Sequence, residues 1–124
     1  MVSEKNGTWG TAKQVPGTAA LNTGGFAEMP SVSCASAGNC SAGGDYFDRT
    51  GFGHAFVVSE KNGTWGTATK VPGTAALNHE NAEIPSVSCG SAGNCSAGGF
   101  YTDSSGHRQA YVVSETNGTG GTTK

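Results

Sequence analysis

An internal repeat constrains the fold of this chain more than any other feature of its sequence. The stretch Val57–Trp65, VVSEKNGTW, recurs near the start as Val2–Trp9 and, with more changes, near the end as Val112–Gly120. Trp9 and Trp65 are 56 residues apart (65 − 9). A period of this length indicates an array of supersecondary units that bury their hydrophobic faces against one another.

One change in length between the copies locates a loop. Cys34 and Cys89 are 55 residues apart (89 − 34), one fewer than the two tryptophans. The missing residue lies where TGGFAEM, between Asn22 and Pro30, becomes HENAEI in the second copy. Loops tolerate such changes because they lie at the surface, so we expect this segment to be exposed.

Each period is predicted to form four antiparallel strands. The chain has 21 glycines and only 13% charged residues, which suits short strands and tight turns and predicts no helix. Gly98 and Gly99 inside the second strand indicate a bulge or a close backbone contact. The expected strands are 85–91, 95–102, 109–114 and, from the preceding copy, 64–71.

Turn residues separate these strands. Asn62-Gly63 is the strongest short hairpin signal in the chain. Asp48 and Asp103 each open a four-residue turn that ends in glycine, where an aspartate caps the turn by accepting hydrogen bonds from its own backbone. Four antiparallel strands per repeat predict an all-β fold built from β-propeller blades.

The segment SEKNGTW resembles the Asp-box of the bacterial neuraminidase repeat, S-x-D-x-G-x-T-W. Its spacing is one residue shorter, and Asn62 stands closest to the place of the aspartate. The resemblance implies a structural hairpin between the third and fourth strands of a propeller blade. The residues that carry it are Ser3, Asn6, Gly7, Trp9, Ser59, Asn62, Gly63 and Trp65.

The pattern SCxSxGNCxAGG, present twice, is similar to the disulfide-containing tandem repeats of secreted actinobacterial proteins. This resemblance covers nearly the whole chain and implies secretion, but it implies no activity. The repeated SCxSxGNCxAGG pattern is the feature that carries this resemblance.

Four cysteines form two copies of one spacing. Cys34 with Cys40, and Cys89 with Cys95, bracket short polar loops, as cysteines facing each other across a hairpin would. Each disulfide would contribute about 2 kcal/mol and implies an oxidising, extracellular setting. The alternative is zinc, but C-x5-C lacks the usual ligand spacing and the histidines keep no regular offset, so we expect no metal and no cofactor.

Charge and hydropathy exclude two classes of partner. The net charge is −2 with no run of Lys or Arg, so neither nucleic acid nor an anionic membrane surface is an expected partner. No apolar stretch reaches the roughly 18 residues of a membrane span. The start of the chain does not resemble a signal peptide, so an exported protein would have had its signal removed.

The expected partner is the chain itself. The chain is a single repeat domain with three parts: residues 1–22 supply the fourth strand of a shared blade, residues 30–73 form a complete blade, and residues 85–118 supply the first three strands of a shared blade. Propellers close with about four to eight blades, so two repeats do not make a ring. We expect a cyclic homo-oligomer, a trimer or tetramer, closed by strand exchange. The alternative is a fragment or an engineered excerpt of a longer array.

An enzyme is not expected. Sialidases with Asp-boxes bind the substrate carboxylate through three arginines, and this chain has two, Arg49 and Arg108. A carboxylate pair for glycoside hydrolysis would have to come from Asp45, Asp48 or Asp103. Because two of these occupy turn positions, a glycoside hydrolase fragment is the least favoured function.

Multivalent carbohydrate binding is the predicted function, since repeated loops around a ring give weak sites avidity. The alternative function is a self-assembling or engineered scaffold without a ligand. The alternative role for Tyr46 and Tyr101 is to pack between the blades. Trp9 or Trp65 would join a sugar site only if exposed. The predicted ligand residues are Tyr46, Asp48, Tyr101, Asp103 and His107.

Overall fold

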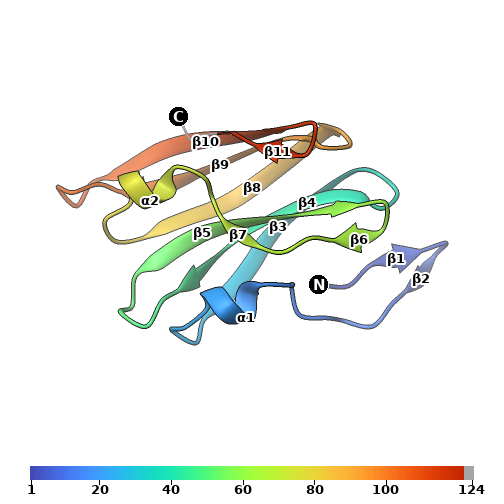
Figure 1. The fold of residues 1–124 in the computed structure, drawn as a ribbon, viewed down its shortest axis with the longest axis horizontal. Coiled ribbons are helices and arrows are strands. Elements are labelled where there is room, and N and C mark those ends of the chain that lie inside the picture. Colours follow the sequence, from blue (N-terminus) through green and yellow to red (C-terminus); the bar gives the residue numbers. More distant parts are fainter. Residues whose placement is uncertain (122–124) are drawn as a thin grey trace.

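Two antiparallel sheets of similar strand order lie face to face and make up most of the molecule (Figure 1). The computed structural model describes residues 1–121. In the first sheet, strands follow the chain order and β7 extends the outer edge by pairing with β5. Its strands are β3 (Ala27–Ser36), β4 (Asn39–Phe47), β5 (Gly53–Lys61), β6 (Thr64–Trp65) and β7 (Thr69–Lys70). Those of the second sheet are β8 (Ala82–Ser91), β9 (Asn94–Thr102), β10 (Arg108–Thr116) and β11 (Thr119–Gly120).

The sequence-predicted strands are present in the predicted order, but their number and their ends differ. β8 begins at Ala82, three residues before the expected start, and the long outer strand of the first sheet is interrupted between β6 and β7. The outer strand of the second sheet, which the sequence did not predict, is present as the short β11. The all-β fold is confirmed.

A small hairpin and two single-turn helices complete the described chain. β1 (Glu4–Lys5) pairs with β2 (Thr8–Trp9) in a separate two-stranded sheet that projects from one end of the molecule (Figure 1). The helices are α1 (Thr18–Leu21) and α2 (Thr74–Leu77).

The expectation of no helix is therefore wrong at two places. Gly73, with φ of 90°, turns the chain immediately before α2, and the hydroxyl of Thr74 donates to the carbonyl of Val71 over 2.7 Å. Because the repeat preserves these residues, α1 begins in the same way. One turn closed by such local bonds forms despite a composition that disfavours longer helices.

Three copies of one tight hairpin mark the repeat. Asn6, Asn62 and Asn117 have φ of 50°, 50° and 49°, and each is followed by a glycine whose φ is also positive. Two successive residues with positive φ define the type I′ turn, whose twist matches that of the flanking strands. The hairpin predicted at Asn62-Gly63 is confirmed.

Close backbone contacts explain the second glycine of each pair in the second strand. A Cβ atom on Gly44 would lie 2.0 Å from the carbonyl oxygen of Glu28, and one on Gly99 would lie 1.9 Å from that of Glu83. Both glycines face an irregularity in the neighbouring strand, where the register shifts. The predicted close contact is confirmed, and the bulge belongs to the first strand rather than to the second.

Both predicted disulfides are present. Cys34 bonds Cys40 and Cys89 bonds Cys95, with Cα–Cα distances of 3.9 and 4.0 Å between directly opposed residues. Each bridge joins the first two strands of its sheet beside their connecting turn. The bonds indicate an oxidising environment. No helix in the described part of the chain is long and apolar enough to cross a membrane.

Two hydrophobic clusters lie on the two faces of the first sheet. The cluster between the sheets contains Ile84, Tyr111 and Val113 of the second sheet with Ala55 of the first. The other cluster, built around Phe56, lies on the opposite face and is covered in part by Val15, Leu21 and other residues. Strand β8 contacts β3, β4 and β5, so it forms the centre of the contact between the sheets.

Candidate functional site

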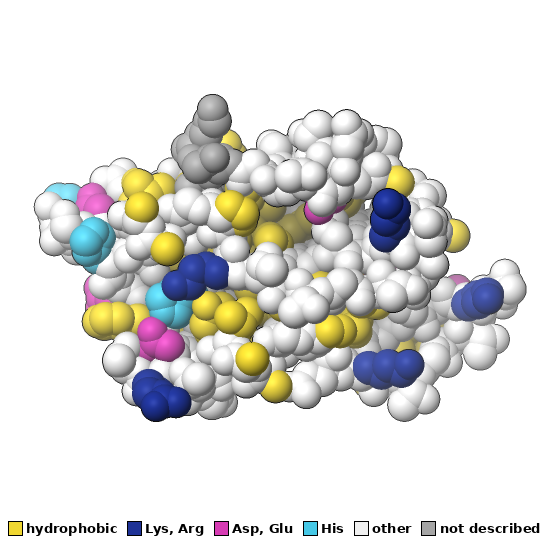
Figure 2. Space-filling model, in the orientation of Figure 1, with side chains coloured by type: hydrophobic (Ala, Val, Ile, Leu, Met, Phe, Trp, Pro, Cys, Tyr) yellow, Lys and Arg dark blue, Asp and Glu magenta, His cyan; other side chains and the backbone are white. Residues whose placement is uncertain are grey.

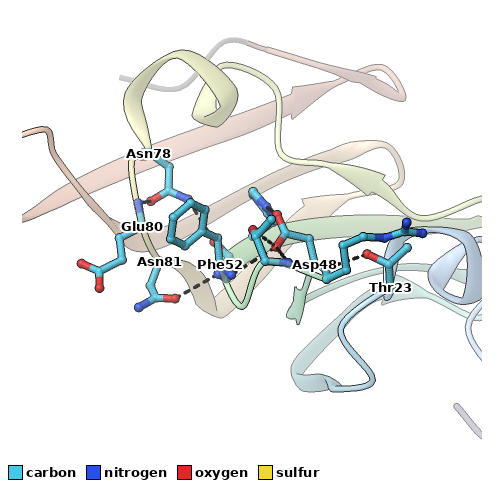
Figure 3. Close-up of polar contacts among 10 residues, drawn as sticks. Thr23, Asp48, Phe52, Asn78, Glu80 and Asn81 are labelled. Atoms are coloured by element: carbon cyan, nitrogen blue, oxygen red, sulfur yellow. Dashed lines mark hydrogen bonds and ion pairs between the residues drawn. The ribbon is translucent and has the colours of Figure 1, made fainter.

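The predicted ligand residues lie at one end of the two sheets, in and beside the β4–β5 and β9–β10 turns (Figure 1). Asp48 closes the first of these turns. Its Oδ1 accepts backbone N–H bonds from Thr50 and Phe52, over 2.9 and 3.2 Å, and its Oδ2 lies 2.7 Å from Nε2 of His54 (Figure 3). The side-chain bonds from Thr50 and His54 hold the pKa of the Asp48 carboxyl well below its ordinary value.

Asp103 has the same role in the second sheet. Its Oδ1 accepts the backbone N–H groups of Ser105 and His107, each over 2.9 Å, and its Oδ2 accepts a bond from the Gln109 side chain. The bond from Gln109, followed by that from His107, lowers the pKa of Asp103. Both aspartates are thus engaged in holding their own turns.

The aromatic members of the predicted site are not equally accessible. Tyr46 is 4% exposed and packs against His54 and Phe56, with ring centroids 5.3 and 6.4 Å apart. Burial, followed by the charge of Asp48, raises the pKa of the Tyr46 hydroxyl. Tyr101 is half-buried, whereas His107 is exposed. Tyr46 is therefore a core residue, as in the alternative in which the tyrosines pack the strands.

The linker between the sheets forms a polar junction that the sequence did not reveal (Figure 3). The Asn78 amide donates to the carbonyl of Gly53 over 2.9 Å and its oxygen accepts the N–H of Thr102 over 3.3 Å. Asn81 in turn accepts the N–H of Gly53 over 2.9 Å. The expected exposure holds for residues 23–28 of the first copy. It is wrong for Ala82 and Ile84 of the second copy, which are buried at the start of β8. The sequence feature that could have indicated a structural role for Asn78 is that Asn22 occupies the equivalent position in the other copy.

Serine hydroxyls connect the inner strands of the two sheets. Ser31 Oγ accepts the backbone N–H of Val87 over 3.0 Å, and Ser33 Oγ accepts that of Cys89 over 3.1 Å. These bonds use N–H groups that point out of the β8–β9 ladder toward the first sheet. The alternating serines of the repeat thus have a defined role at the contact between sheets.

The asparagine of the SCxSxGNC pattern joins two turns. Asn39 Oδ1 accepts the N–H of Asn62 over 3.2 Å, and the carbonyl of Gly38 accepts the N–H of Gly63 over 2.9 Å. Asn94 binds the N–H of Asn117 in the same way. The motif therefore fixes the β3–β4 turn against the hairpin that carries the Asp-box-like residues.

The two tryptophans of that motif differ in environment. Trp65 is half-buried against the Phe56 cluster, and its indole N–H is enclosed without a hydrogen-bond partner among the described residues. Trp9 is 65% exposed on the projecting hairpin. Gly10 donates to the carbonyl of Ser3 as Gly66 donates to that of Ser59, so the hairpins have the same backbone bonding.

Asp45 is a buried carboxylate at the contact between the sheets. It is 4% exposed on the face of β4 that meets the second sheet. Burial, with smaller contributions from the charges of Glu28 and Glu83, raises the pKa of Asp45 to about 6. Residues 1–121 contain no group of three or more His, Cys, Asp or Glu that would hold a metal ion.

A cavity of about 310 Å³ opens between the outer parts of the sheets. Figure 2 shows hydrophobic side chains in a recess between the two layers. Its walls include Val57, Pro72, Ala97, Val113, Glu115 and Gly120. At the polar end, Ser59 Oγ donates to Oε2 of Glu115 over 2.7 Å and lies 2.9 Å from Ser41 Oγ.

Comparisons with known proteins give no identification. No protein-family model matches the chain, and no match was found among curated proteins or among solved structures.

Proposed function

We propose that this chain is a non-catalytic repeat module whose sheets stack as blades of a propeller-type array and whose outer faces bind further copies of the chain. The observation that carries the proposal is the unequal burial of equivalent valines. Val57 and Val87 pack into the cluster between the sheets. Their equivalents, Val112 and Val32, are 58% and 57% exposed on the outer faces.

The two outer faces are complementary because they repeat the two surfaces that meet inside the chain. Covering a valine side chain contributes about 1.5–3 kcal/mol, so both faces favour association. A second copy would place its Val32 face on the Val112 face of the first, as β8 lies on the first sheet. Such a head-to-tail contact closes into a ring when the rotation per copy permits.

Polar groups on the same faces support this arrangement. Ser86 and Ser88, equivalent to the serines that connect the inner strands, are exposed. At the other end, the amides of Val32 and Cys34 occupy the ladder positions of Val87 and Cys89, so they point away from β4. One copy therefore offers hydroxyl acceptors where the next offers N–H donors.

We expect three or four copies per ring in an extracellular setting, where the two disulfides persist. Exchange of an outer strand remains the proposed means of closure. In the single chain β1 pairs with β2, so exchange would require this small hairpin to open.

Light scattering during size-exclusion chromatography tests the assembly. The proposal predicts a mass near three or four times the chain mass of 12.4 kDa. Val112→Asp should reduce this to a monomer with an unchanged circular dichroism spectrum. Ser104→Asp, an exposed change in the β9–β10 turn, is the matched control and should leave the mass unaltered. A folded wild-type monomer at every concentration would exclude the assembly.

Carbohydrate binding, predicted from the sequence, is the second candidate. In a ring of copies the exposed His107, with the half-buried Tyr101, would recur at regular spacing, which is the arrangement that gives avidity. A glycan array with the assembled wild-type protein tests this function. Binding that is lost in His107→Ala supports it, and a flat array with correctly assembled protein contradicts it while leaving the assembly intact.

A further inference from the structure

The repeat shows what the cavity between the sheets lacks. Trp65 pairs with Glu60 across β5 and β6, and in the second sheet Gly120 pairs with Glu115 in the same register. Cross-strand partners project from the same face of a sheet. A side chain at position 120 would therefore point where Glu115 points, toward the first sheet.

The walls of the cavity support this correspondence. Trp65 packs against the cluster that includes Ala42 and Val58, and the equivalent residues Ala97 and Val113 line the cavity beside Gly120. A Cβ atom on Gly120 would meet the ring of Pro72, another wall residue, at an ordinary contact distance of 3.4 Å. The cavity thus occupies the position that an indole ring fills in the first sheet.

We propose that this cavity is a binding site for a small, flat heteroaromatic molecule with a ring N–H, for which indole is the probe. The volume of about 310 Å³ lies at the lower limit of ligand pockets, about 300–1,000 Å³, which suits a molecule of one or two rings. Apolar cavities without a filling side chain bind aromatic molecules of matching size.

The carboxylate of Glu115 gives the site its preference for an N–H donor. One of its oxygens accepts the hydroxyl of Ser59, and the other oxygen has no hydrogen-bond partner among residues 1–121. Glu115 is half-buried at the cavity wall, where a hydrogen bond to an ionised acceptor is stronger than one to a neutral acceptor. A ring N–H directed at this end would bind it, and a ring oxygen would be repelled.

The site is formed by residues of one chain, so it is tested on dilute, monomeric protein, in which no outer strand of a neighbouring copy can occupy it. Isothermal titration of the full chain with indole should show saturable binding of one molecule per chain. Benzofuran has the same shape but an oxygen in place of the N–H, and it should bind at least about tenfold more weakly because the hydrogen bond to a charged group is lost. Equal affinity for the two probes would overturn the role of Glu115.

Filling the cavity by substitution provides the second arm of the test. Gly120→Trp should abolish indole binding, whereas Ser104→Trp, which adds the same ring on an exposed turn, should leave it unchanged. Gly120→Leu gives the same readout with a smaller side chain should the tryptophan variant fail to fold. Absence of indole binding by the wild-type chain, or binding that persists in both folded Gly120 variants, would overturn the proposal.

Discussion

The two sheets share one set of supporting contacts and differ in what fills the spaces around them. Both contain the disulfide beside the first turn, the asparagine that joins two turns, and the aspartate that closes the opposite turn. They differ at Trp65, where the second sheet has Gly120, and at Asp45, where it has Phe100. The residues that the repeat preserves fix the backbone of each sheet. The residues that differ between the copies determine how the side chains of each sheet pack against neighbouring elements.

The largest effect should come from the shared backbone contacts. Gly44→Ala and Gly99→Ala each place a methyl group against a main-chain carbonyl, which cannot move aside as a side chain can. We expect each to lower the free energy of unfolding by about 3 kcal/mol or more in urea titrations. Gly90→Ala is the control, because its Cβ would meet nothing within 4 Å. A mild effect in one sheet alone would break the equivalence of the sheets.

The tryptophans should separate the two environments of the same motif. Trp65→Ala removes a half-buried ring from the Phe56 cluster and should cost about 2–4 kcal/mol. Trp9→Ala removes a ring that is 65% exposed and should change the free energy of unfolding by about 0.5 kcal/mol or less in dilute solution. Equal costs in dilute monomer would show that the projecting hairpin packs as the inner one does.

Asp45 should make the contact between the sheets sensitive to pH. Its pKa of about 6 in the folded chain lies above its ordinary value of 3.8, so the folded state binds the proton more tightly. Protonation of Asp45 therefore favours the folded state; this stabilisation is fully present below pH 3.8 and is lost as the pH rises through 6. Asp45→Asn should raise the free energy of unfolding at pH 8 by about 1–3 kcal/mol and by much less at pH 4. A pH-independent difference would contradict this account.

The smallest effect should come from making the second sheet resemble the first. Gly120→Trp fills the cavity beside Val113 and should raise the free energy of unfolding by about 1 kcal/mol, measured by thermal and urea denaturation. Ser104→Trp should leave it unchanged. A loss of stability in Gly120→Trp would mean that the recess does not have the shape of the Trp65 site.

The sequence predicted those features that depend on local chemistry. The Asn62-Gly63 hairpin, the two disulfides and the close contact at Gly99 follow from residues adjacent in the chain or directly opposed across one ladder. The burial of Tyr46 and the recess beside Gly120 depend instead on how one sheet lies on another. Alternation along a strand shows that two faces differ, but it does not show which face meets the next sheet.

The hydrogen bonds of Asn78 are a second example of contacts between sheets that a local sequence pattern does not predict. The change in length between the copies correctly located a connecting segment, and such segments are exposed in most proteins. Here Asn78 and Asn81 carry hydrogen bonds to both sheets, which no local pattern distinguishes from ordinary turn asparagines. Their partners, Gly53 and Thr102, lie more than 20 residues away, in different sheets.

Amide hydrogen exchange at four residues tests most directly whether further copies cover the outer faces. The amides of Val87 and Cys89 donate to serines of the first sheet and should be protected at every protein concentration. Those of Val32 and Cys34 should exchange freely in dilute solution and slow by about tenfold or more as the chain associates. Free exchange at Val32 and Cys34 in concentrated, fully folded protein would contradict the account.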